Sequence, residues 1–141
     1  MRTVFADSFH LFGLLNRADN NHESCRQFAS GFRGRVVTTE YVLLELADGL
    51  ASPNHRQRTA RFIRQLRASP AVSVVSASTP LLLEALTLYE SRADKPWSLT
   101  DCTSFVVMKH EGLVEALTGD RHFQQAGFNA LLSGADETKQ A

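Results

Sequence analysis

Short apolar segments alternate with segments of helical periodicity along almost the whole chain, and this alternation limits the folds available to it. The strand-like segments are 3–6, 36–38, 72–75 and 114–118, with a last candidate at 128–132. Between them lie helical segments at 8–16, 19–30, from Thr38 or Thr39 to Gly49, 54–67, 80–92, 101–111 and 121–126. Because short apolar strands joined through helices form right-handed crossovers, we predict an α/β fold in three layers around a mostly parallel sheet.

Composition indicates an ordinary globular chain. With 141 residues, 43% of them hydrophobic and 21% charged, we expect one domain over 1–133 and a disordered polar tail at 134–141. No apolar run approaches the ~20 residues of a membrane span, and the N-terminus lacks a signal-peptide core, so we expect a cytoplasmic protein without a membrane partner. Cys25 and Cys102 form no CxxC pair, which favours buried or unreactive thiols over a disulfide or a zinc site.

Four acidic residues mark points where an apolar stretch meets a helix, or lie within an apolar helical face: Asp7, Glu45, Asp101 and Asp120. Asp7 and Asp120 each follow a strand-like segment, and the carboxyl ends of parallel strands share one edge of the sheet. Carboxylates gathered there repel by roughly 4 kcal/mol per close pair, so they persist only if they are protonated or neutralised by cations. We therefore predict an oxygen-ligated metal site.

Each of these acids also has a structural explanation. Asp7 and Asp120 could cap the helices that follow them, and Asp101 could complete a capping box with Ser98. Glu45 lies among apolar residues, where burial without a partner would cost several kcal/mol, so a salt bridge to an arginine is its alternative.

The segment 54–67 carries five arginines and no acidic residue, although the formal net charge of the whole chain is zero. Arginines such as Arg58, Arg61 and Arg64 could hold the phosphates of a nucleic acid. They are spread around much of the helix, so a plain solvated face is the alternative. Aromatic residues interleave poorly with them, and a platform for stacking bases is not evident in the sequence.

Four motifs occur in order over residues 2–132: VFADSF, TTEYVLLELADGL, SLTDCTSFVVMKHEG and TGDRHFQQAGF. In this order and spacing the chain resembles PIN-domain proteins, in particular the VapC-like ribonuclease toxins of type II toxin-antitoxin pairs. The resemblance implies a compact α/β/α sandwich and a metal-dependent endoribonuclease. It also implies that the partners are an RNA substrate, a cognate antitoxin docked against exposed helices, and a second copy of the chain in a homodimer.

The same resemblance implies roles for individual residues. The catalytic acids would be Asp7, Glu45, Asp101 and Asp120, of which Asp7, Asp101 and Asp120 would bind metal. Ser8 and Thr118 would support them through hydrogen bonds. The family sometimes has a further acid near the position of His122, and we expect this histidine to lie at the surface or contact substrate rather than bind metal.

Hard carboxylate oxygens select Mg²⁺ or Mn²⁺. A bound ion lowers the pKa of an attacking water, and a second, where present, stabilises the leaving oxygen. The resemblance implies products with 5′-phosphate and 3′-hydroxyl ends.

The sequence lacks the residues that several other enzyme classes require. Phe9 occupies the place where a haloacid-dehalogenase phosphatase has its second Asp, and GxSxG, HExxH and a glycine-rich phosphate loop are missing. Two alternatives stay open: a catalytically weak scaffold that binds RNA or protein, and a nuclease acting on DNA.

Overall fold

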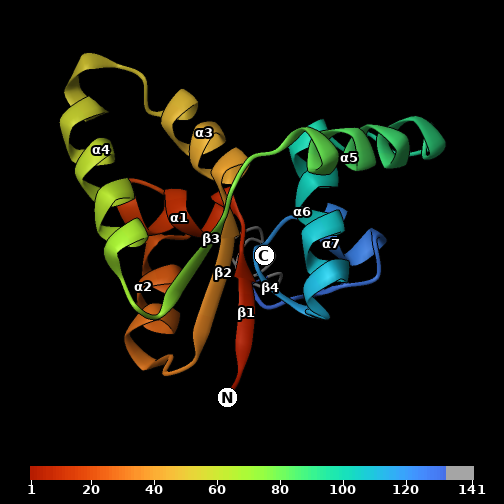
Figure 1. Cartoon of the computed structure of the whole chain (residues 1–141). Coiled ribbons are helices and arrows are strands. Elements are labelled where there is room, and N and C mark those ends of the chain that lie inside the picture. The colour runs from red at the N-terminus through yellow and green to blue at the C-terminus, as the bar shows by residue number, and fades with distance from the viewer. Residues whose placement is uncertain (133–141) are drawn as a thin grey trace.

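A parallel sheet forms the centre of the protein in the computed structural model, which describes residues 1–132 (Figure 1). Its strand order is β3-β2-β1-β4-β5, and each neighbouring pair is parallel. The strands are β1 (Thr3–Ala6), β2 (Arg35–Thr39), β3 (Val72–Val75), β4 (Glu115–Leu117) and β5 (Asn129–Ala130). The predicted α/β class is confirmed, while the proposed tail at 134–141 lies outside the described residues.

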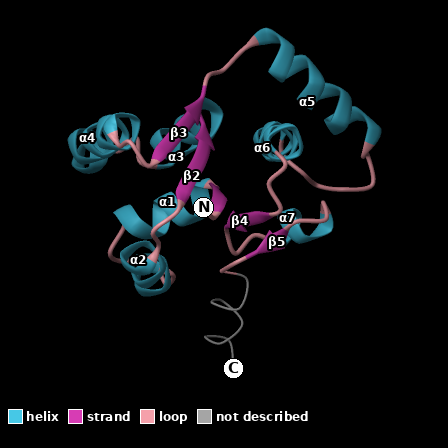
Figure 2. Ribbon diagram, turned by 60° about the horizontal axis from the view of Figure 1, so that its bottom comes forward, coloured by secondary structure: helices cyan, strands magenta, loops and turns pink. Residues whose placement is uncertain are grey.

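Helices cover both faces of this sheet, which gives the three layers (Figures 1 and 2). One face carries α1 (Ser8–Leu15), α2 (His22–Gly31), α3 (Glu40–Gly49) and α4 (Pro53–Ala68). The other carries α5 (Thr79–Ser91), α6 (Leu99–Glu111) and α7 (Arg121–Gln125). Among the described residues, no helix is long and apolar enough to cross a membrane.

Two elements differ most from the sequence prediction. The helix expected from Asp19 begins at His22, because the Asp19 carboxylate accepts the Asn21 N–H at 2.7 Å. Such a side-chain contact to the backbone two residues on stabilises a turn in competition with a helix. The strand expected at 128–132 is reduced to Asn129–Ala130.

The hydrophobic core is built around β1 and α6, and it also includes residues of α1 and α3. Val4, Phe5 and Ala6 of β1 are fully buried, and α6 is buried without interruption from Asp101 to Met108. The Phe105 ring of α6 packs edge-on against Phe123 with 4.9 Å between ring centroids. Since α6 is enclosed by its neighbours, the acid in its first turn is held at a fixed place beside the end of β1.

Gly34 illustrates how closely the strands approach. A Cβ at this position would lie 2.0 Å from the backbone oxygen of Arg2, at the start of the β1–β2 pairing. We expect Gly34→Ala to lower the free energy of unfolding by about 1–3 kcal/mol, because the backbone must move to admit the methyl group.

Urea unfolding of Gly34→Ala and Gly31→Ala would test this expectation. A Cβ at Gly31 would meet no heavy atom within 4 Å, so that variant should retain the stability of the wild type. Equal stability of the two variants would contradict the close approach.

Candidate functional site

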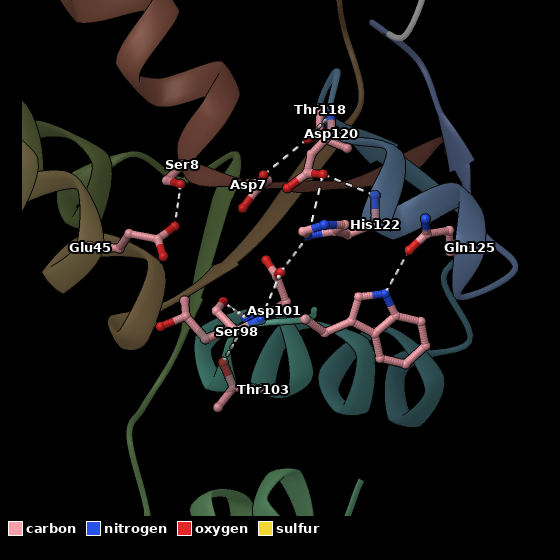
Figure 3. Close-up of polar contacts among 12 residues, drawn as sticks. Asp7, Ser8, Glu45, Ser98, Asp101, Thr103, Thr118, Asp120, His122 and Gln125 are labelled. Carbon is pink, nitrogen blue, oxygen red and sulfur yellow. Dashed lines mark hydrogen bonds and ion pairs between the residues drawn. The ribbon is translucent and has the colours of Figure 1, made fainter. Parts of the chain in front are cut away.

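The four acids line one pocket of about 700 Å³ at the carboxyl edge of the sheet (Figure 3). Asp7 follows β1, Asp120 follows β4, Glu45 projects from the middle of α3, and Asp101 lies in the first turn of α6. Acidic side chains from four distant parts of the chain thus face the same space. The structure brings together the residues that the sequence analysis selected.

Asp7 is the most deeply buried of the four, with 4% of its surface exposed. The Thr118 hydroxyl donates a hydrogen bond of 3.0 Å to its Oδ2. Burial raises the pKa of Asp7 to about 7, and the charges of Asp101 and Glu45 add to this rise against the opposing effect of the Thr118 bond. Asp7 occupies the N-cap position of α1, but its side chain makes no capping hydrogen bond to that helix.

Glu45 is half-buried and accepts a hydrogen bond from the Ser8 hydroxyl (Figure 3). Burial raises its pKa, and the charges of Asp101 and Asp120 raise it further although the Ser8 bond opposes them. No arginine forms an ion pair with Glu45 within residues 1–132, so the salt-bridge alternative is wrong.

Asp101 and Asp120 do cap helices, as the structural alternative proposed, and they face the pocket as well. Asp101 Oδ2 accepts the Ser98 N–H at 3.1 Å, and Ser98 Oγ accepts the Asp101 N–H at 2.9 Å, which completes the capping box. Asp120 Oδ1 accepts the His122 N–H at 2.9 Å. Each cap uses one carboxylate oxygen and fixes the side chain.

His122 lies inside the cluster, which the sequence analysis did not foresee. Its Nδ1 is 3.0 Å from Asp101 Oδ2 and 3.5 Å from Asp120 Oδ1. One potential ligand atom from each of these three residues falls within 4.8 Å of the others. The signal available in the sequence was its place two residues after Asp120, in the first turn of a short helix.

The donor set fits a divalent cation. In Glu45, Asp101 and Asp120 one carboxylate oxygen is held by a donor, while the other accepts no hydrogen bond from the described residues. These oxygens share the pocket with Asp7, whose pKa is raised chiefly by burial and further by the charges of Asp101 and Glu45. A divalent cation would neutralise the combined negative charge of the ionised carboxylates.

The pocket also contains residues that sequence reasoning missed. Phe9, Phe12, Arg121 and Gln124 line it together with the acids. Helix α4 contributes no residue to the pocket lining, so the arginines selected from the sequence lie outside it.

Residues 4–129 match the PIN domain family. The chain belongs to this family. Two Mycobacterium tuberculosis strains have a relative named 23S rRNA-specific endonuclease VapC20, which is 27% identical over 125 residues. The match covers 89% of this chain and 95% of the relative.

Solved structures agree with the family assignment. The crystal structure of Mycobacterium tuberculosis VapC20, described as a sarcin-ricin loop cleaving toxin, has a TM-score of 0.81 at 27% identity, covering 89% of this chain and 95% of that chain. The FitAcB structure from Neisseria gonorrhoeae has a TM-score of 0.65 at 16% identity, covering 90% of this chain and 94% of that one, and shows the fold alone.

The buried Asp7 carboxyl makes the stability of the metal-free protein depend on pH. Its folded-state pKa of about 7 lies above the ordinary 3.8, so its contribution to stability is present below about pH 4 and is lost as the pH rises to about 7. We expect Asp7→Asn to be more stable than the wild type at pH 8 in EDTA, by at most about 4 kcal/mol, and to lose this advantage toward pH 4.

Thermal unfolding at pH 5 and pH 8 would measure the effect. Glu111→Gln, an exposed acid at the end of α6 and outside the pocket lining, is the control substitution. A difference between Asp7→Asn and wild type that is the same at both pH values would contradict the raised pKa.

Proposed function

We propose that this PIN-domain protein is a metal-dependent endoribonuclease that hydrolyses RNA phosphodiester bonds. The observation that carries the proposal is the single pocket in which Asp7, Glu45, Asp101 and Asp120 converge. Support comes from the VapC20 relative, which is named a 23S rRNA-specific endonuclease and aligns over nearly its whole length.

Asp7, Asp101 and Asp120 are the residues that would hold the cation, and we propose Mg²⁺ or Mn²⁺ because the donors are mainly hard oxygens. When bound, such an ion lowers the pKa of water and neutralises charge on a phosphate. Thr118 holds Asp7 by its Oδ2, and the Ser98 N–H holds Asp101 by its Oδ2, so both carboxylates are oriented before any ligand arrives.

Glu45 would take a proton from the attacking water at Oε2, because Ser8 holds the other oxygen and burial raises the pKa of the side chain. In this proposal water attacks the phosphorus and the P–O bond to the 3′-oxygen breaks, and that oxygen takes up a proton from solvent, so the products would carry 5′-phosphate and 3′-hydroxyl ends. We further propose that Arg58, Arg61 and Arg64 of α4 contact RNA phosphates outside the pocket, since all three are exposed.

Purified protein should cleave RNA with Mg²⁺ or Mn²⁺ and should lose this activity in EDTA. We expect Asp7→Asn and Asp101→Asn to reduce cleavage at least ~100-fold, because each removes a charge that the cation requires. Gel analysis of RNA cleavage would measure this, with circular dichroism to verify folding. Glu111→Gln, an exposed acid at the end of α6 and outside the pocket lining, should retain full activity.

The outcome of this assay also separates the alternatives. Undiminished cleavage in EDTA would contradict the proposal. RNA or protein binding without cleavage by the wild type, retained in both variants, would indicate a scaffold. Cleavage confined to DNA would indicate a different substrate.

We also propose that the protein is the toxin of a type II toxin-antitoxin pair, with an antitoxin that docks on exposed helices and covers the pocket, and that it forms a homodimer. The support is the description of VapC20 as a toxin.

Induction of the wild type should arrest bacterial growth within a few generations, whereas Asp101→Asn should not, because the acidic site would be incomplete. Growth curves with matched expression levels would measure this. Unaffected growth despite cleavage of RNA in vitro would contradict the toxin role.

A further inference from the structure

We propose that Phe9 is a stacking platform for one unpaired nucleobase of the substrate, placed beside the carboxylates of the pocket. This inference rests on the proposed ribonuclease function and specifies its substrate class as RNA whose target segment is single-stranded.

The surroundings of Phe9 differ from those of the other pocket phenylalanine. Phe12 packs against the hydrophobic core cluster, whereas Phe9 does not belong to that cluster as the described residues define it. Phe9 is only half-buried and lines the pocket with Asp7 and Asp120. An aromatic ring that contributes nothing to the core, in a pocket dominated by acids, needs another explanation.

The ring of Phe9 is held in a defined position by Gly119. A Cβ at Gly119 would lie 2.5 Å from Phe9 Cζ and 3.0 Å from both Cε atoms, so the ring occupies the space that a side chain would fill. Gly119 lies between Thr118, which bonds Asp7, and Asp120. The ring is therefore in contact with the loop that builds the acidic site.

A nucleobase is the ligand that fits this combination. Every base has a flat π-face that stacks on an aromatic side chain, and such stacking tolerates any base identity. A base within a duplex has both faces covered by its neighbours, so only an unpaired base can stack here. With a phosphate near the carboxylates, its adjoining base would reach the ring, because Phe9 and Asp7 line the same pocket.

Two polar side chains of α7 also line the pocket. Arg121 and Gln124 both line it and are exposed. Arg121 forms no ion pair with any residue in the described part of the chain, which leaves its guanidinium available to a phosphate. Gln124 offers an amide that can pair with a base edge.

The test combines a protein variant with base removal in the RNA. Binding of a short single-stranded RNA is measured by fluorescence anisotropy in Ca²⁺, with the RNA verified as intact on a gel. A matched set of RNAs lacks the base at one position at a time. We expect Phe9→Leu to weaken binding of the complete RNA roughly 10-fold. Removal of the base at one position should weaken wild-type binding by a similar factor. Removal of the same base should not weaken the binding of Phe9→Leu any further.

Three further variants make the result specific. Phe9→Trp keeps an aromatic face and should bind at least as tightly as the wild type, and it also serves if Phe9→Leu does not fold. Phe28→Leu, on α2 and outside the pocket lining, should show the same sensitivity to base removal as the wild type. Gly119→Ala displaces the ring and should weaken binding as Phe9→Leu does.

The stacking role would be overturned if Phe9→Leu bound complete RNA as tightly as the wild type. It would also be overturned if base removal weakened the wild type and Phe9→Leu equally at every position. Failure of the ribonuclease proposal itself has a different signature, since the wild type would then cleave no RNA in Mg²⁺ or Mn²⁺, whether or not it binds RNA in Ca²⁺.

Discussion

Mutual repulsion between carboxylates is the constraint on which the rest of this structure depends. Four acids share one pocket, and the most buried of them has its pKa raised to about 7. A fold can hold such a group only if its surroundings are rigid enough to resist separation of the charges. The parallel sheet and the enclosed helix α6 provide that rigidity, because neither can move without exposing core side chains.

The hydrogen bonds around the pocket serve local structure and site geometry together. The Ser98 capping box both begins α6 and orients Asp101, and the Asp120 cap both begins α7 and brings His122 against Asp101. A helix cap satisfies backbone N–H groups at the start of the helix in any protein. Here the same hydrogen bonds also orient the acids, so no separate interaction is needed for that purpose. The same contact then leaves a second oxygen for a ligand.

The sequence was sufficient for the class of fold and for the four acids, because hydrophobic periodicity and position after strands are local signals. It was insufficient for His122, Phe9 and Arg121, whose importance depends on which segments pack together. Glu45 shows the same limit, since its partner is Ser8, 37 positions away, and no periodicity indicates that contact. Turn chemistry at Asp19 also overrode the helical pattern that the sequence suggested.

The distribution of the pocket along the chain has a consequence for synthesis. Asp7 is synthesised more than a hundred positions before its partner Thr118 and the last acid, Asp120. A nascent chain therefore carries an incomplete centre until the segment through Asp120 has left the ribosome. Premature termination before β4 would leave Asp7 without its hydroxyl donor, so truncated products cannot assemble the pocket.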